Sequence, residues 1–411
     1  MLDPLGYIAI ALLTLFTVFL ALKYPPITKI IIFALIIRFI FLIINNNIFF
    51  LPDGDMDSLN FERRAWDWSQ GGFINVFNHY KGPDTYFLSF LIAIPYSLFG
   101  RSILMAHSFS IFFGIASVFL GWLAAKKLWD DRTAIKVGWM IAIFPSLVSY
   151  SVLTMREVYI TFFLLLAFYG IINWVRQRSY NSIILTVFGF VSATFFHGAS
   201  IIGLFIFFLI LFLDGFKESF KLLLVNRINF KFLVVIGLSS IILTTYVTNK
   251  ISIPYLGNFQ EMGNTEKLEN VINFRTKGDA AYPEWTRINS NVEYLYKLPI
   301  RSIYFLFSPF PWDVKKISHL VGLFDSLLYI ALAFLIFLNR KAILKDPTLK
   351  IILLILICYF IIFGVGVSNF GTGIRHRSKF LIELILLAGP LIPKLNFSKI
   401  KLKKSMKQIF K

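Results

Sequence analysis

Apolar runs long enough to cross a bilayer recur along the whole 411-residue chain. A transmembrane helix needs about 20 mostly apolar residues, and eleven runs approach that length. They are residues 6–22, 29–50, 103–125, 137–153, 158–175, 182–196, 198–214, 232–247, 319–338, 350–367 and 379–393. Because a backbone in lipid must satisfy its own hydrogen bonds, the pattern predicts an all-α, polytopic membrane protein with about 11 transmembrane helices (roughly 10 to 13).

The composition agrees with a membrane protein and excludes other classes. Hydrophobic residues make up 57% of the chain and charged residues 15%, whereas a soluble domain carries roughly a quarter charged residues. A soluble enzyme, a disordered chain and a fibrous protein are therefore excluded. The single Cys358 leaves no intrachain disulfide and no cysteine-based metal site.

The net charge of +19 comes from basic loops between apolar runs, so it indicates membrane orientation rather than nucleic-acid binding. The tail 394–411 carries seven lysines and is placed in the cytoplasm. Segment 85–100 is short and contains Pro95, so we expect a re-entrant or surface-lying helix there. Counting back from the tail then puts the other basic connections on the cytoplasmic side: 126–136, 176–178, 217–231 and 340–350.

The opposite face collects the acids, histidines and arginines in motif-like groups. It holds the first long outer loop 51–102, the turn 154–157, His197, the second outer loop 248–318 and the turn 368–378. Whether 298–312 crosses the membrane stays open. We interpret residues 1–411 as a single membrane domain in a bacterial inner or plasma membrane, with a site that faces the periplasm or exterior.

Three carboxylates alternate directly after the second apolar run, at Asp53, Asp55 and Asp57. Ionised acids at a membrane border lose hydration, so a cluster is costly unless it binds something. Mutual repulsion disfavours ionising all three, which can leave one of them as a base. The three could instead bind a divalent cation, Mg²⁺ or Mn²⁺, the one cofactor that the sequence suggests. The simpler alternative is a solvated loop that ends the helix.

Other polar residues of this face are candidates for substrate binding. Glu62 belongs to an aromatic-rich stretch that reads as an interfacial helix, and His79 and Lys81 follow it. His197 lies between two apolar runs, where a packed, hydrogen-bonded histidine is the commoner outcome. The full substrate-binding set is Asp53, Glu62, His79, Lys81 and His197. Farther along, Ser308–Asp313 (Ser-Pro-Phe-Pro-Trp-Asp) resembles a rigid, aromatic interfacial turn.

Two adjacent charges, Arg156 and Glu157, occupy a short turn between apolar runs and cannot both face lipid. One interpretation is a structural ion pair. The other places Glu157, as a catalytic carboxylate, against the acidic loop and Arg156 against an anion.

The segment 368–379 combines two glycines with Arg375, His376 and Arg377. Arginine forks match phosphate oxygens, and residues i and i+2 of an extended turn point the same way. We therefore expect Arg375 and Arg377 to clamp one phosphate, with a basic helix cap as the alternative. Glu383 could pair with Lys379 at i, i+4 and orient it.

Taken together, these motifs resemble the integral-membrane glycosyltransferases of the GT-C fold, which include protein O-mannosyltransferases and lipid A aminoarabinose transferases. The family's first outer loop reads Asp-Glu-x-x-Tyr-x-x-x-Ala, ending near a glycine pair. Here Asp57-Ser-Leu-Asn-Phe61-Glu-Arg-Arg-Ala65 and Gly71-Gly72 keep that spacing, with Ser58 for the acid and Phe61 for the Tyr. Stretches similar to the family's next motifs are His79-Tyr-Lys81-Gly-Pro83 and Leu98-Phe-Gly100. The resemblance covers roughly residues 30–215.

The resemblance implies a transferase that moves a sugar from a polyprenyl-phosphate donor to a glycan, lipid or protein acceptor, usually with inversion. Asp57 matches the catalytic Asp, with Asp55 or Asp53 as substitutes for the missing second acid. Cations then stabilise the departing lipid phosphate: Arg375, Arg377, His376 and Arg156. The partners are lipids and glycans, and no nucleic acid is implied.

Two other functions compete with this one. An O-antigen or exopolysaccharide polymerase or ligase would use the outer arginines equally well, but such enzymes rely on Arg rather than on an outer-loop Asp. A lipid-linked glycan flippase would place charges along the interior of many spans, and here the span centres are almost free of charge. We rank polymerase or ligase second and transport third.

The topology can be tested by cysteine labelling in a Cys358→Ser background. We expect Asn60→Cys, in the first outer loop, to react with a membrane-impermeant thiol reagent added from outside intact cells. A cytoplasmic reporter, Lys341→Cys, should react only after permeabilisation. Labelling of position 60 from the cytoplasmic side alone would contradict the topology.

Overall fold

The computed structural model describes residues 3–80, 82, 85–223, 237, 240, 244, 278–288 and 292–394. Within these residues all regular structure is helical, apart from one isolated antiparallel bridge between Ala281 and Asn369. Seven described helices are long and apolar enough to cross a membrane, or up to eight if one bent pair counts as a span. The seven are α1 (Pro4–Lys23), α2 (Thr28–Asn47), α6 (Ile103–Leu128), α9 (Arg156–Gln177), α11 (Ile201–Leu223), α15 (Ser318–Leu338) and α17 (Pro347–Gly366).

The structure thus confirms a polytopic helical membrane protein but does not support the expected count of about 11 spans. The run 137–153 is the bent pair α7 (Asp131–Ile143) and α8 (Pro145–Val152), which meet at 56°. Pro145 forces this break, because the residue before a proline is held out of the α region and Phe144 is extended.

Two further apolar runs also fail to form a helix long enough to span the membrane. Residues 182–196 fall in α10 (Tyr180–Phe196), which has only 17 residues. The last run is divided among η6 (Ser378–Phe380), α19 (Leu381–Ala388) and η7 (Gly389–Leu391). The run 232–247 lies outside the described residues, apart from three isolated positions.

The first long outer loop contains three short helices, α3 (Asp57–Ser69), α4 (Phe73–His79) and α5 (Phe87–Phe99). None of them is long enough to cross a membrane. The segment 298–312, whose crossing of the membrane was left open, falls largely in α14 (Glu293–Phe307). This helix has 15 residues and is also too short to span the membrane.

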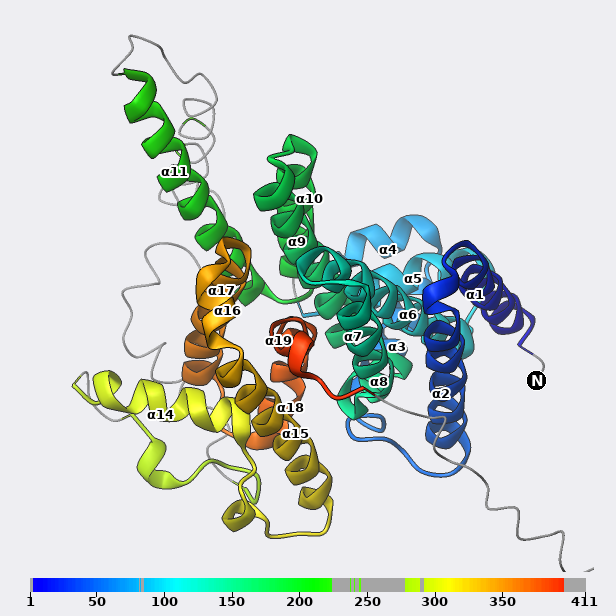
Figure 1. Ribbon diagram of the computed structural model, residues 1–411. Coiled ribbons are helices and arrows are strands. Elements are labelled where there is room, and N and C mark those ends of the chain that lie inside the picture. The colour runs from blue at the N-terminus through cyan, green and yellow to red at the C-terminus, as the bar shows by residue number, and fades with distance from the viewer. Residues whose placement is uncertain are drawn as a thin grey trace, which may run out of the picture.

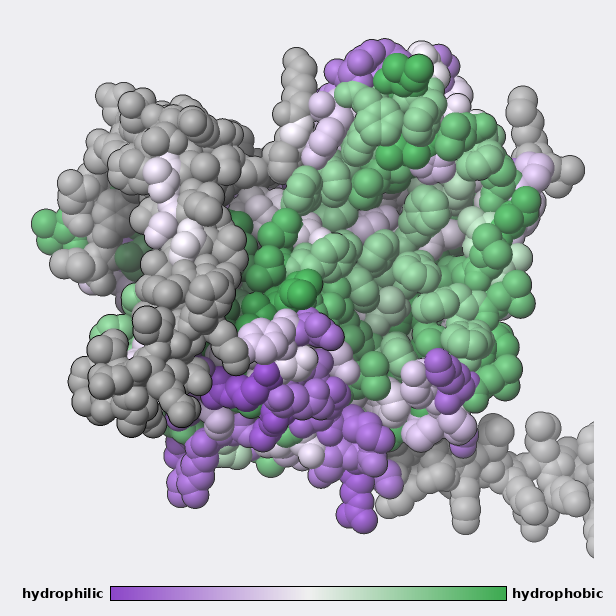
Figure 2. Space-filling view, turned by 90° about the horizontal axis from the view of Figure 1, so that it is seen from above, coloured by the Kyte–Doolittle hydropathy of each residue, from purple (hydrophilic) through white to green (hydrophobic). Residues whose placement is uncertain are grey.

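A broad apolar surface identifies the face that meets lipid. Figure 2 shows a wide hydrophobic area with hydrophilic side chains gathered at its upper and lower edges in that view. Large apolar side chains remain exposed along α1 and α15, among them Leu12, Leu22 and Phe334. A soluble protein rarely exposes so much contiguous apolar surface, so these helices face the bilayer.

The interior of the bundle is built on α6 and α9, the most buried of the spans. Helices α9 and α10 lie side by side and antiparallel (Figure 1). They approach closely because a Cβ at Gly189 would lie only 2.5 Å from the backbone nitrogen of Ala167. This packing brings the start of α9, with Arg156 and Glu157, to the same end of the bundle as His197.

An ion pair between a buried carboxylate and a partly exposed arginine joins two helices of the first outer loop. Arg101, just after α5, donates to both carboxylate oxygens of Glu62 on α3, at 2.9 and 2.7 Å. Tyr96 donates its hydroxyl to the same carboxylate at 2.9 Å. The Glu62 side chain is 2% exposed and that of Arg101 37%. The interaction explains why α3 and α5 pack together at one end of the bundle.

We expect Arg101→Ala to destabilise the protein by about 1–3 kcal/mol, because it leaves the buried Glu62 carboxylate without its charged donor. Lys126→Ala is the matched control, since it breaks an exposed pair with Asp131 that contributes little. Thermal unfolding in detergent should show a lower Tm only for Arg101→Ala. Equal Tm values for the two variants would mean that the pair does not hold the loop.

Candidate functional site

The candidate site forms where the C-terminal ends of α2 and α8 meet the N-terminal end of α9. A buried hydrogen bond joins the first turn of α3 to the turn between α8 and α9, from the backbone nitrogen of Thr154 to the hydroxyl oxygen of Ser58 at 3.0 Å. Ser58 follows Asp57 and Thr154 precedes Arg156, so this bond sets the acidic loop beside the α8–α9 turn.

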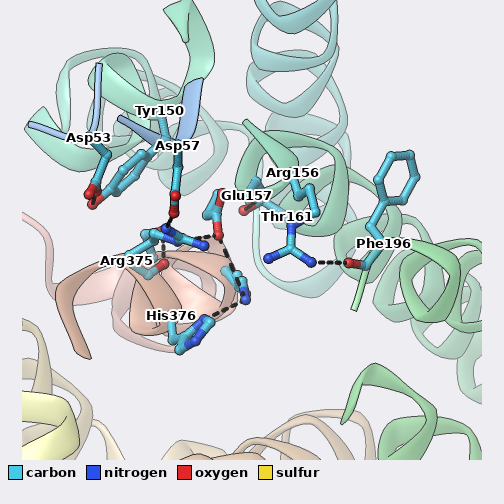
Figure 3. Close-up of polar contacts among 11 residues, drawn as sticks. Asp53, Asp57, Tyr150, Arg156, Glu157, Thr161, Phe196, Arg375 and His376 are labelled. Atoms are coloured by element: carbon cyan, nitrogen blue, oxygen red, sulfur yellow. Dashed lines mark hydrogen bonds and ion pairs between the residues drawn. The ribbon is translucent and has the colours of Figure 1, made fainter. Parts of the chain in front are cut away.

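Arg375 is at the centre of the site (Figure 3). It lies on α18 (Phe370–Arg377) and donates its Nε to Oε1 of Glu157 at 2.9 Å and its Nη1 to Oδ2 of Asp57. Burial alone would lower the pKa of Arg375, but the carboxylates of Glu157 and Asp57 outweigh it and raise that pKa. One guanidinium group therefore joins two carboxylates that come from different parts of the chain.

The three acids of the loop differ in their surroundings. The Asp57 side chain is 43% exposed and pairs with Arg375. Asp53 is partly buried and accepts a hydrogen bond from the Tyr150 hydroxyl at 3.3 Å. Burial raises the pKa of Asp53, with Arg375 opposing the shift and Glu157 reinforcing it. Asp55 is exposed.

Arg156 and Glu157 point apart instead of forming an ion pair with each other. Arg156 donates Nη1 to the carbonyl oxygen of Phe196 at 3.2 Å and lies over the ring of Phe61 (Figure 3). Its Nε has no hydrogen-bond partner among the described residues. Glu157 contacts Arg375 instead, so the structural ion pair between Arg156 and Glu157 is not among the described ion pairs, and a catalytic role for Glu157 and an anion at Arg156 stay predictions.

A second group of basic side chains borders Glu157. The ammonium group of Lys379 lies 3.9 Å from Oε1 of Glu157 and 2.6 Å from Nδ1 of His376. The ring centroids of His376 and His197 lie 5.2 Å apart. Burial, opposed by Glu157, lowers the pKa of Lys379. The site therefore contains three basic side chains, Arg156, Arg375 and Lys379, around one buried carboxylate.

The expectation that Arg375 and Arg377 form one clamp is wrong in its geometry. Asn369 caps α18 by accepting from the backbone nitrogen of Thr372 at 2.7 Å, so the segment is helical rather than extended. Residues i and i+2 of a helix point about 200° apart. Arg377 accordingly faces away and binds Asp325 at 2.7 Å and the carbonyl oxygens of Leu306 and Ser308.

The expected pair between Lys379 and Glu383 is also absent from the described ion pairs. Lys379 is directed to Glu157 and His376, and both carboxylate oxygens of Glu383 lack a hydrogen-bond partner among the described residues. The backbone from 378 to 380 is a 3₁₀ helix, which changes the i, i+4 spacing on which the expectation depended.

Two of the candidate substrate-binding residues, Glu62 and His79, are not brought to Arg375, and a third falls outside the part of the chain that the structure describes. Glu62 is held by Arg101 and Tyr96. His79 is exposed and its ring stacks on Trp68 at 5.7 Å. Lys81 lies outside the described residues. Of that set the structure places Asp53 and His197 in the site.

The loop acids do not fit a metal site as they stand. Within the described ranges no group of three His, Cys, Asp or Glu side chains could hold a metal ion. Asp57 is engaged by Arg375, and Asp55 is directed to solvent. We therefore assign no chemical role to a divalent cation.

Two residues of the site were absent from the sequence-based set of candidates. Tyr150 lies near the end of the apolar run 137–153 and contacts Asp53. The polar pair Ser149-Tyr150, close to the turn 154–157, was the available signal. Lys379 was assigned only to Glu383, because its contacts depend on where α18 ends.

No family model, curated protein or solved structure matches the chain at a significant level.

We expect the stability of the protein to fall as the pH drops below about 6.5. Burial, followed by the charge of Lys379, holds the pKa values of His376 and His197 well below 6.5, the value in an unfolded chain. Below that pH the unfolded state binds protons that the native state does not, so each histidine contributes up to about 1.4 kcal/mol of destabilisation per pH unit.

The measurement is Tm in detergent at pH 7.5 and 5.5 for the wild type, His376→Gln and the exposed control His79→Gln. His376→Gln should show a smaller loss of Tm than the wild type, and His79→Gln should not differ from it. Identical losses in all three would contradict the assignment of a buried neutral His376.

Proposed function

We propose that this protein is a membrane glycosyltransferase that moves a sugar from a polyprenyl-phosphate donor to an acceptor hydroxyl in cell-surface polysaccharide or glycoconjugate synthesis. The observation that carries the proposal is the network of Asp57, Arg375 and Glu157. It combines a partly exposed carboxylate with a cation suited to phosphate at one end of a membrane bundle. We further propose that this end faces the periplasm or exterior of a bacterial plasma membrane.

The reaction requires a base and a stabiliser of the leaving group. Asp57 takes the proton of the acceptor hydroxyl, and the oxygen forms a bond to the anomeric carbon. The bond between that carbon and the phosphate oxygen breaks, and the electron pair leaves on the lipid phosphate. Arg375 meets the growing negative charge with its guanidinium fork. Attack opposite to the leaving group inverts the anomeric centre.

Exposure favours Asp57 over Glu157 as the base. The Asp57 side chain is 43% exposed, whereas that of Glu157 is 1% exposed and adjoins both Arg375 and Lys379. Glu157 is better suited to orient Arg375 than to meet a substrate. Asp53 is the second candidate, because its raised pKa brings it closer to that of an effective base.

The remaining cations give a phosphate more than one donor. Arg156 lies on the side of Glu157 opposite to Asp57 (Figure 3), and the ammonium group of Lys379 lies 3.9 Å from Oε1 of Glu157. A donor phosphate bound beside these basic side chains would form its main ion pair with Arg375. The isoprenoid tail would reach the site from the bilayer, which the apolar surface of the bundle meets directly.

A polymerase or ligase that uses lipid-diphosphate-linked glycans remains the second candidate, because the same basic side chains suit a diphosphate. Purified protein incubated with radiolabelled polyprenyl-phosphate sugars and candidate acceptors tests the first proposal. Transfer from diphosphate-linked donors alone would favour the second. Absence of transfer from any carrier would favour transport.

Asp57→Asn should lower kcat by at least about 100-fold, the usual scale for a lost general base, with expression retained. The matched control is Asp55→Asn, two residues away and exposed, which should keep wild-type activity. Full activity of Asp57→Asn together with an inactive Asp55→Asn would shift the base by two residues.

The same assay separates the two arginines of α18. Arg375→Lys should lower kcat and raise the donor KM, because a point charge lacks the fork, by roughly 2–4 kcal/mol in transition-state stabilisation. Arg377→Lys should lower the yield of folded protein and leave the specific activity unchanged. Wild-type kinetics in Arg375→Lys would remove Arg375 from the mechanism.

A further inference from the structure

A cavity lies in the described part of the second outer loop. Its volume is about 480 Å³, which is within the range for small-molecule sites. Its walls come from two segments, 278–288 and 311–315, and contain one exposed and one buried aromatic side chain among several charged groups. The lining includes Asp279, Tyr282, Glu284, Arg287, Trp312 and Asp313.

Trp312 forms a rigid aromatic platform in this cavity. Its ring is stacked on Phe310, with centroids 4.8 Å apart and planes 9° from parallel. Its indole nitrogen donates to the Tyr304 hydroxyl at 3.4 Å. These two contacts fix one face and one edge, yet the residue is 70% exposed. A flat apolar surface held open in this way is suited to the C–H face of a sugar ring, as it is to other stacking partners.

The lining carries charges of both signs, three carboxyl groups (Asp279, Glu284 and Asp313) and two basic groups (Arg287 and Lys315). Asp279 pairs with Lys316, just outside the lining, at 2.5 Å, and Glu284 pairs with Arg287 at 3.4 Å. Asp313 accepts from the backbone nitrogen of Phe310 at 2.9 Å, and burial raises its pKa. The cavity therefore offers hydrogen-bonding groups without a strong net field of either sign. A neutral polyhydroxylated ligand fits this better than an anion or a cation does.

The backbone connects this cavity to the candidate site. The nitrogen of Tyr282 donates to the carbonyl oxygen of Ser368 at 2.9 Å, and that of Phe370 donates to Ala280 at 2.9 Å. Arg301, which is fully buried, secures the same turn by donating to the carbonyl oxygens of Val365 and Val367. Phe370 begins α18 and Arg375 follows five residues later, about 8 Å along the axis. A bound chain of sugars could therefore extend from the cavity toward Arg375.

The geometry points to a binding site for a neutral glycan in this cavity, with one sugar ring stacked on Trp312 and its hydroxyl groups bound by Asp313 and by the Glu284–Arg287 pair. This inference rests on the proposed function in one respect, since the bound glycan serves there as the acceptor. It identifies the acceptor as an uncharged saccharide rather than a protein or a phosphorylated lipid.

Binding can be measured without any transfer reaction. Full-length protein in nanodiscs, carrying a fluorescent tag, is applied to an array of neutral oligosaccharides, anionic oligosaccharides and acidic peptides. We expect retention on neutral oligosaccharides, and a loss of roughly tenfold or more in apparent affinity for Trp312→Ala. Trp312→Phe should keep part of the binding because it retains an aromatic face.

Trp285→Ala is the matched control, because Trp285 is exposed on the same loop, contacts Tyr304 edge-on and does not line the cavity. It should bind as the wild type does. Retention of no neutral oligosaccharide, retention of anionic ones only, or equal binding by the wild type and Trp312→Ala would each overturn the inference. An impaired insertion of Trp312→Ala without any glycan binding by the wild type would make Trp312 a membrane-interface anchor.

A transfer assay separates this inference from the proposed function. If transfer occurs, Trp312→Ala should raise the acceptor KM and leave the donor KM unchanged. Transfer that is insensitive to Trp312→Ala would overturn the glycan site and leave the transferase in place. Glycan binding without transfer from any lipid donor would overturn the transferase and keep the glycan site.

Discussion

The site depends on the two ion pairs that Arg375 forms with Asp57 and Glu157. Asp57 starts α3, Glu157 lies in the first turn of α9, and Arg375 is on α18. A carboxylate as buried as Glu157 would be costly near a membrane without a charged partner. The guanidinium of Arg375 offsets that cost and at the same time fixes the positions of three segments. The remaining side chains of the site are arranged around these two contacts.

Arg375 and Arg377 of α18 point in nearly opposite directions because the segment is a helix. Arg375 is directed to Asp57 and Glu157. Arg377 is directed into the bundle, where it binds Asp325, Ser326 and two carbonyl oxygens. A short sequence with two arginines thus serves both the candidate chemistry and the attachment of α18 to α15. Arg375 and Arg377 thus link the stability of the bundle to the proposed activity through one short helix.

The helical class and the site's main segments could be predicted from the sequence, since apolar runs, alternating acids and glycine-rich turns are local signals. The breaks in the bundle were not predicted, because the length and overall apolar character of each run indicated an unbroken span although Pro145 and Pro390 lie inside the two runs. The helical state of 370–377 was missed although Asn369 is a favourable N-cap residue. The ion pair of Glu62 with Arg101 spans 39 residues, and no local pattern indicates such a partner.

The separation in sequence of the paired charges has a consequence for biosynthesis. Glu157 and Arg375 are 218 residues apart. At translation rates of about 5–20 residues per second, Arg375 is synthesised roughly 10–40 s after Glu157. The nascent N-terminal half must hold its carboxylates hydrated or protonated during that interval, so the polar end of the bundle closes only when the last helices are inserted. A chain that terminates before α18 would keep this end open and would expose unpaired acids to the machinery that removes incomplete membrane proteins.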